Sequence, residues 1–239
     1  MTILGLQLTT DRLPQIRYFY GQTLQLPVLE EREDTFAVQV GYTKLIFTIA
    51  EAETPTPAYA FGFSVPAERF ENVTYALGQV LQLYAPEQRT TDANARPTVY
   101  FTDPANNAVS VVSQESLAED GENTNPLSLL AVGELSFIVD DVQDVRQALE
   151  ARFEFHAFPT ASGTRVAMRG VDTTFYLVPR GETLLPDGGA KADVFPIMMT
   201  LAGTTNAVDR IGEYPYFISI ADVTGEAGIS GARVEARPV

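Results

Sequence analysis

This chain is poor in the thiol and imidazole groups that most often carry nucleophilic catalysis and transition-metal binding. Its 239 residues include no cysteine and a single histidine, His156. Without cysteine the chain has no disulfides, no thiolate nucleophile and no Cys-based zinc or iron–sulfur site. A lone histidine is more often a surface or packing residue than a catalytic base. The sequence therefore offers almost no material for Ser–His or Cys–His catalysis, and it has no Gly-rich phosphate loop of either common spacing.

The charge of the chain excludes some classes of partner. Its 16 Lys and Arg against 31 Asp and Glu give a formal net charge of −15. Nucleic acids and anionic membranes bind clustered basic residues, so we expect neither as a partner. The acidity indicates either simple solubility or a cationic ligand. No stretch of about 18 apolar residues and no signal core is present, and we expect a cytoplasmic protein.

The elements that position any site repeat along the chain. A strand with alternating residues is followed by a helix and two more strands, and after a proline-punctuated linker the same order begins again. The first unit consists of the strand Leu4–Thr9, a helix with Leu13, Ile16, Phe19 and Tyr20 on one face, and the strands Phe36–Val40 and Lys44–Ile49. The second consists of a strand through Phe61, Phe63 and Val65, a helix with Phe70, Val73, Leu77, Val80 and Leu81 on one face, and the strands Thr98–Phe101 and Ala108–Ser113.

The C-terminal half contains a third copy of the unit. It starts at Glu134–Val139, continues in a helix through Val142, Val145, Leu149 and Phe153, and closes with the strands Thr164–Arg169 and Thr173–Val178. Strands at Val194–Leu201 and Tyr216–Ile220 without a helix between them indicate a degenerate fourth copy, and the end from Glu226 shows no clear period. We predict an α+β fold of repeated βαβββ modules that form cupped mixed sheets with helices on the outer face. Two paired modules at 1–114, a linker at 115–128, and the third and fourth modules at 129–239 are the expected domains.

Alternation also predicts which face of each sheet could hold a ligand. The Leu, Phe and Val residues of each strand should face the helices, which leaves the residues between them on a concave face. That face is neutral and mostly small: Gly5, Gln7, Thr9, Gln39, Ile46, Thr48, Ala60, Gly62, Ser64, Thr98, Tyr100 and Ser110.

Several runs resemble the vicinal oxygen chelate superfamily, which includes glyoxalases, bleomycin-resistance proteins and ring-cleaving dioxygenases. Residues 18–20 and 24–28 are similar to its opening "FY…LGLPV", residues 38–47 to its central hairpin, and residues 59–66 to its second opening strand. Tyr100-Phe101-Thr102-Asp103-Pro104-Ala105-Asn106-Asn107 resembles its "YFxDPxGN". In this order the motifs cover residues 3–114, and residues 133–179 resemble a further module.

The resemblance implies a divalent metal held by His, Glu or Gln from the first and last strands of two paired modules. Carried onto this chain, those positions are Gly5, Ala60, Thr48 (or Ile46) and Ser110, none of which is a competent ligand. Glu134 occupies the first-strand ligand position of the third module. It is either the remnant of a site, for which Thr200 and Met198 are unsuitable partners, or a carboxylate that is solvated or paired with Arg165 or Arg169.

We therefore expect a glyoxalase or bleomycin-resistance-like protein without metal or other cofactor that binds or sequesters a small organic molecule. The alternative is an enzyme with a displaced site, either a glyoxalase-like lyase or isomerase or an extradiol-type dioxygenase. The ligand should be cationic or aromatic, and a homodimer is left open. The residues expected to contact the ligand are Gln7, Gln39, Thr48, Ser64, Tyr100, Ser110 and Glu134.

Overall fold

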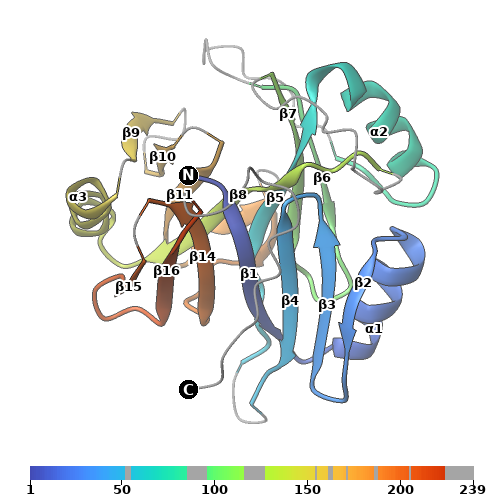
Figure 1. Cartoon of the computed structure of the whole chain (residues 1–239), viewed down its shortest axis with the longest axis horizontal. Helices are drawn as coiled ribbons and strands as arrows, with labels where there is room; N and C mark the ends of the chain where they lie inside the picture. Colours follow the sequence, from blue (N-terminus) through green and yellow to red (C-terminus); the bar gives the residue numbers. More distant parts are fainter. Residues whose placement is uncertain are drawn as a thin grey trace.

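The chain forms two seven-stranded sheets in a computed structural model that describes residues 1–51, 55–84, 96–115, 127–153, 155–160, 164–170, 172–185, 188–204 and 206–223 (Figure 1). The first sheet has the strand order β15-β16-β14-β1-β4-β3-β2, and the second has the order β6-β7-β5-β8-β11-β10-β9. The predicted α+β fold of repeated modules is confirmed. Within the described residues, no helix is long and apolar enough to cross a membrane.

Four modules supply these sheets, each with its first and last strands parallel. The first comprises β1 (Ile3–Thr10), α1 (Leu13–Tyr18) with the π-helical η1 (Phe19–Thr23), β2 (Val28–Glu31), β3 (Thr35–Val40) and β4 (Thr43–Ile49). The second comprises β5 (Ala60–Pro66), the 3-10 turn η2 (Ala67–Arg69), α2 (Phe70–Gly78), β6 (Thr98–Thr102) and β7 (Ala108–Gln114). The third comprises β8 (Ala131–Val139), α3 (Val142–Arg152), β9 (His156–Pro159), β10 (Val166–Arg169) and β11 (Thr174–Pro179). The fourth comprises β14 (Ile197–Gly203), β15 (Ala207–Arg210) and β16 (Tyr216–Asp222), and it is preceded by the hairpin β12 (Thr183–Leu185) and β13 (Gly188–Lys191).

The modules do not pair in chain order. β1 pairs antiparallel with β14, so modules one and four share the first sheet, and β5 pairs antiparallel with β8, so modules two and three share the second. The expected pairing of the first two modules in one sheet is therefore wrong. The physical reason is that each first strand has an open edge to pair, and β14 and β8 carry the same alternation as β1 and β5 do, so alternation alone does not select the partner. Most of the expected linker, and the end of the chain from Glu226, lie outside the described residues.

The core lies between the two sheets and beneath the helices. Leu6, Leu8, Phe61 and Phe63 are almost fully buried in it, as their alternation predicted. The Phe137 and Tyr216 rings, one from each sheet, lie 5.0 Å apart between their centroids. Since the core residues cover one face of each sheet, the opposite face, here called the open face, is where a ligand can reach the strands.

One residue of the first strand departs from the expected alternation. Leu4 is only partly buried, and Ile3 enters the core in its place. The pairing of β1 with β14 shifts register between Ile3 and Gly5, which is the mark of a β-bulge. A bulge inserts one extra residue, so the alternation of side chains between the two faces shifts by one residue there. Ile3 instead of Leu4 therefore points into the core.

The turn between β6 and β7 ties the second module to the first helix. The carboxylate of Asp103 is buried and accepts hydrogen bonds from the backbone N–H groups of Ala105 and Asn107, from the Asn107 amide and from the Tyr20 hydroxyl, the last two at 2.8 Å. Burial raises the pKa of Asp103 despite these donors. Asn107 in turn accepts from the backbone N–H of Tyr59, so the turn that resembles "DPxGN" is a buried polar junction.

Candidate functional site

Four neighbouring strands of the second sheet bring one residue each to a single row on the open face. Ser110 of β7 pairs with Gly62 of β5, Gly62 with Glu134 of β8, and Glu134 with Thr174 of β11. These are the first and last strands of modules two and three. The row is therefore where the implied metal ligands of this pair of modules would converge.

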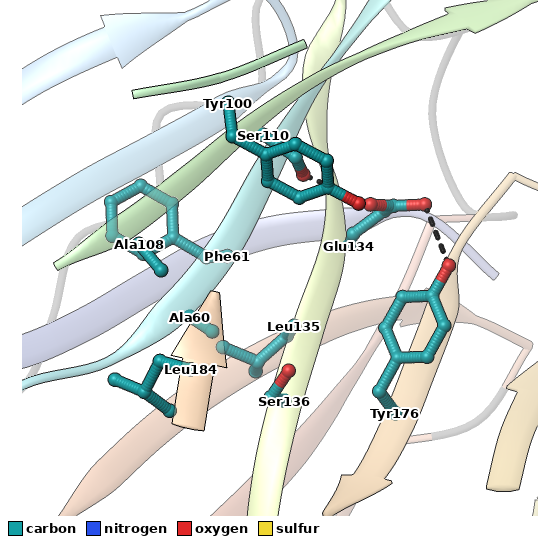
Figure 2. Close-up of a pocket in the computed structure, with 10 residues that line it drawn as sticks. All are labelled: Ala60, Phe61, Tyr100, Ala108, Ser110, Glu134, Leu135, Ser136, Tyr176 and Leu184. Atoms are coloured by element: carbon teal, nitrogen blue, oxygen red, sulfur yellow. Dashed lines mark hydrogen bonds between the residues drawn. The ribbon is translucent and has the colours of Figure 1, made fainter. Parts of the chain in front are cut away.

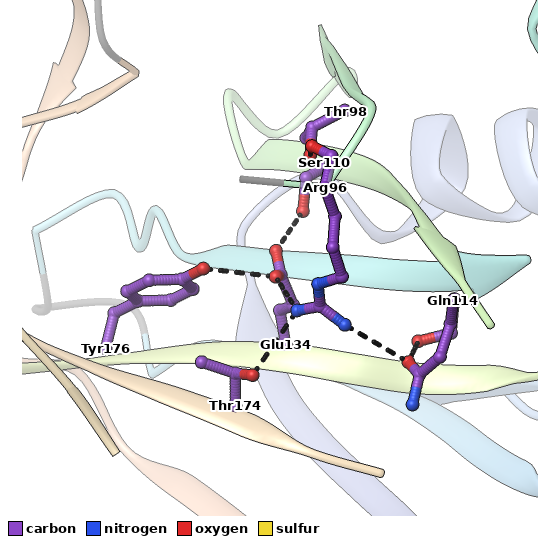
Figure 3. Close-up of polar contacts among 8 residues, drawn as sticks. Arg96, Thr98, Ser110, Gln114, Glu134, Thr174 and Tyr176 are labelled. Carbon is purple, nitrogen blue, oxygen red and sulfur yellow. Dashed lines mark hydrogen bonds and ion pairs between the residues drawn. The ribbon is translucent and has the colours of Figure 1, made fainter. Parts of the chain in front are cut away.

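Glu134 is the centre of this row, and its carboxylate is engaged on both oxygens (Figure 3). Oε1 accepts from Arg96 Nη2 at 3.0 Å and from the Tyr176 hydroxyl at 3.1 Å, while Oε2 accepts from the Ser110 hydroxyl at 2.9 Å. The residue is only 7% exposed. A buried carboxylate needs a cation or several donors to offset its desolvation, and Glu134 has both.

Arg96 reaches Glu134 from the segment before β6 and joins it to further polar groups. Its guanidinium also contacts the Thr174 hydroxyl and Gln114 Oε1, each at 3.4 Å. The buried Ser64 hydroxyl donates to the same Gln114 oxygen at 2.9 Å. Ser64 is thus part of the polar network beneath the open face, and the expectation that it faces a ligand does not fit its burial at 1% exposure.

A small pocket lies beside Glu134 (Figure 2). It encloses about 60 Å³ between a polar end and an apolar end. The polar end contains Glu134, Ser110 and the hydroxyls of Tyr100 and Tyr176, and the other, mostly apolar end contains Ala60, Ala108, Leu184 and Ser136. The pocket is below the roughly 300 Å³ of a typical ligand site, so it can take one terminal group of a larger molecule.

Both tyrosines of the pocket remain protonated at neutral pH. Burial, together with the nearby Glu134 carboxylate, raises the pKa of Tyr100 to about 12, and Arg165 opposes the shift. The Glu134 carboxylate, followed by burial, raises the pKa of Tyr176 well above its ordinary value. Their hydroxyls therefore act as neutral hydrogen-bonding groups.

The hairpin β12–β13 closes one end of the pocket through Leu184, which packs with Ala108, Ile138 and Val178 in a small apolar cluster. Arg165 holds the base of the hairpin, because its Nε lies 2.7 Å from Glu182 Oε2 and its Nη2 donates to the carbonyl of Thr183. No strand was predicted here from the sequence. The expectation that Glu134 would pair with Arg165 or Arg169 is wrong, since its partner is Arg96.

The residues expected to contact one ligand are divided between the two sheets. Tyr100, Ser110 and Glu134 come together in the second sheet, with Ser64 buried behind them. Gln7, Gln39 and Thr48 lie on the open face of the first sheet, where Gln7 pairs with Ile46 and Met198, and Thr9 pairs with Thr48. The structure therefore does not bring these two groups together, because modules one and two do not share a sheet.

A divalent metal does not fit the residues of either sheet. In the second sheet the position beside Glu134 on β5 is Gly62, two residues from the expected Ala60, and the rest of the row is Ser110 and Thr174. In the first sheet the row through Gly5 contains Lys44, Thr200 and Ser219. No group of three or more His, Asp or Glu residues that could hold a metal occurs among the described residues. His156 is exposed at the start of the edge strand β9, as a surface histidine would be.

Arg96 and Tyr176 were missing from the expected site. Tyr176 lies two residues after Thr174 on β11, so strand alternation places it on the open face, and this signal was available in the sequence. Arg96 precedes its strand, and no periodic pattern includes it.

Comparisons with known proteins support this fold. A proposed dioxygenase from Bacillus subtilis has a TM-score of 0.62 and 15% identity, over 93% of this chain and 85% of that one. Glyoxalase I from Zea mays has a TM-score of 0.55 and 8% identity, over 92% of each chain. No protein-family model and no curated protein matches the sequence. The likeness shows that the chain has the fold of these glyoxalase and dioxygenase structures.

Proposed function

We propose that this protein binds a small organic molecule in the pocket of the second sheet without a metal ion. The observation that carries the proposal is the engagement of Glu134 by Arg96, Ser110 and Tyr176 at the place where metal ligands would converge. The Arg96 guanidinium supplies there the positive charge that a metal would supply. A metal would have to displace that guanidinium and would find Gly62 and Thr174 as its other neighbours, which are poor ligands.

Binding rather than catalysis is favoured by what the site lacks. Glu134 is held in an ion pair, and the other side chains of the pocket are hydroxyls and apolar groups. The described part of the pocket therefore holds no free charged group that could act as a base. The proposal includes a cytoplasmic location and leaves a homodimer open.

Metal content tests the first half of the proposal. The protein should be purified without chelator, assayed for Mn, Fe, Ni and Zn by elemental analysis, and then titrated with each ion. We expect well below one equivalent of metal and no saturable binding. The matched control is Glu134→Gln, which keeps an acceptor for Ser110. One equivalent of metal per chain that disappears in Glu134→Gln would instead support the metal-dependent lyase, isomerase or dioxygenase.

Ligand binding tests the second part of the proposal, the binding of a small organic molecule, with one variant in each sheet. A thermal-shift screen of small aromatic and amphipathic compounds should produce stabilising hits, because a ligand at a hundred times its dissociation constant adds about 2.7 kcal/mol. Ser136→Leu fills the pocket of the second sheet, and Thr48→Leu alters the open face of the first sheet. We expect Ser136→Leu alone to abolish the hits. If Thr48→Leu abolishes them and Ser136→Leu does not, the binding site is on the first sheet.

A further inference from the structure

The polar end of the pocket has hydrogen-bonding capacity that the protein itself does not use. Within the described part of the chain, the hydroxyl of Tyr100 makes no hydrogen bond, although it lines this end of the pocket. Figure 2 shows the Tyr100 hydroxyl beside the Glu134 carboxylate. A group that enters beside Glu134 therefore meets one uncommitted hydroxyl among the described residues, that of Tyr100.

Glu134 also keeps room for one more donor. A carboxylate oxygen accepts about two hydrogen bonds. Oε1 already has two donors, Arg96 and Tyr176, whereas among the described residues Oε2 has one, Ser110. The ligand group can thus donate to Oε2 and accept from Tyr100.

The charges around the pocket cancel. Glu134 is paired with Arg96 at 3.0 Å, and Arg165 at the hairpin is paired with Glu182 at 2.7 Å. Among the described residues, every other side chain that lines the pocket is uncharged. A charged ligand group would lose its hydration without meeting a free counter-charge, whereas a neutral polar group would exchange water for these hydrogen bonds.

We propose that the pocket takes a neutral terminal group that both donates and accepts hydrogen bonds, a primary carboxamide or an alcohol, and that Tyr100 determines this preference. The inference rests on the function proposed above and names its ligand class. The apolar carbons next to that group would lie towards Ala60, Ala108 and Leu184, and the rest of the ligand would lie outside the pocket, because a volume of about 60 Å³ admits only a terminal group.

Three probes of one shape and different charge test the class: benzamide, benzoate and benzamidinium. Each is titrated into isotope-labelled protein, and binding is followed by the amide resonances of Ser110, Glu134 and Ser136. We expect benzamide to bind at least about tenfold more tightly than either ion. Tyr100→Phe should weaken benzamide about two- to tenfold, the loss of one neutral hydrogen bond. The control is Tyr75→Phe, at an exposed tyrosine of α2, which should leave the affinity unchanged.

The outcomes separate the ligand class from the binding function. Tighter binding of benzoate or benzamidinium overturns the neutral class and leaves pocket binding intact, and the benzamidinium arm tests the cationic ligand that the net charge of −15 suggested. Equal effects of Tyr100→Phe and Tyr75→Phe overturn the role of Tyr100. If none of the three probes shifts the three resonances, the ligand class is wrong, and the screen with Ser136→Leu decides independently whether the pocket binds anything.

Discussion

Removing Arg96 should show how much the free energy of unfolding depends on its ion pair with the buried carboxylate of Glu134. The side chain of Glu134 is 9% exposed and that of Arg96 is 32% exposed, with 3.0 Å between Nη2 and Oε1. Breaking a fully buried ion pair by removing one partner costs about 3–5 kcal/mol. Because water reaches part of Arg96, and Ser110 and Tyr176 still donate to the carboxylate, we expect Arg96→Met to lower the free energy of unfolding by about 2–3 kcal/mol.

Removing the charge of Glu134 should lower the free energy of unfolding by less than removing Arg96. Glu134→Gln removes the charge but keeps an acceptor, and the guanidinium that loses its partner is partly hydrated, so we expect a loss of about 1 kcal/mol. In the double variant Arg96→Met/Glu134→Gln no buried charge is left unpaired. Its loss should therefore be smaller than the sum of the two single losses by about 1–2 kcal/mol.

Urea denaturation followed by circular dichroism measures all three variants. The matched control is Arg152→Met, because Arg152 also pairs with a carboxylate at 2.9 Å, that of Asp209, but with side chains 50% and 40% exposed. An exposed pair contributes about 0–1 kcal/mol. If Arg96→Met costs no more than Arg152→Met, or if the two single losses simply add, Glu134 does not depend on Arg96 and the reasoning about the site is refuted.

Two further predictions concern the fold. Asp103→Asn should lower the free energy of unfolding by about 1–3 kcal/mol, since the new amide faces the Asn107 amide donor. Burial raises the pKa of Asp103 in the folded state, so its titration stabilises the fold most at low pH, and this stabilisation is lost as the pH rises through the folded-state pKa. In urea titrations the difference in stability between wild type and variant should therefore widen towards pH 4. A fragment of residues 1–114 should show no cooperative unfolding transition, because β1 would lack its partner β14 and β5 would lack its partner β8. A fragment that unfolds cooperatively with native-like strand content would contradict this pairing.

Alternation in the sequence was sufficient to predict the modules but not every strand. The face assignment holds for Leu6, Leu8, Phe61 and Phe63, which are buried as expected. The strands that were missed are short, and three of them, β2, β9 and β15, lie at sheet edges. Residues such as Val28 and Val208 on these strands are largely exposed, so burial leaves no period-two pattern there.

The contacts of the site could not be predicted, because they depend on which strands pair across modules, and the local sequence pattern does not determine that pairing. Glu134 was expected on the open face from its place in the third module, and it lies there. Its partners Arg96 and Ser110 belong to the second module, and they reach Glu134 only because β5 pairs with β8. Had β5 paired with β1, as expected, Glu134 would have had neither residue beside it. The same pairing separates Gln7 and Thr48 from Tyr100.

Gly62 connects the fold to the choice between a metal and a polar network. A Cβ atom at this position would lie 2.0 Å from Ser110 Oγ and 3.1 Å from Glu134 Oε2, so any side chain here must displace the hydrogen bond between those two residues. A metal site in this row would need a ligand from β5, and position 62 is the β5 residue that faces Glu134. A ligand at position 62 and the present Ser110–Glu134 contact therefore exclude one another. Arg96 already supplies the cation that Glu134 requires, and Gly62 leaves room for the hydrogen bond between Ser110 and Glu134. The space that remains for a ligand is the part of the pocket beside the neutral Tyr100 hydroxyl.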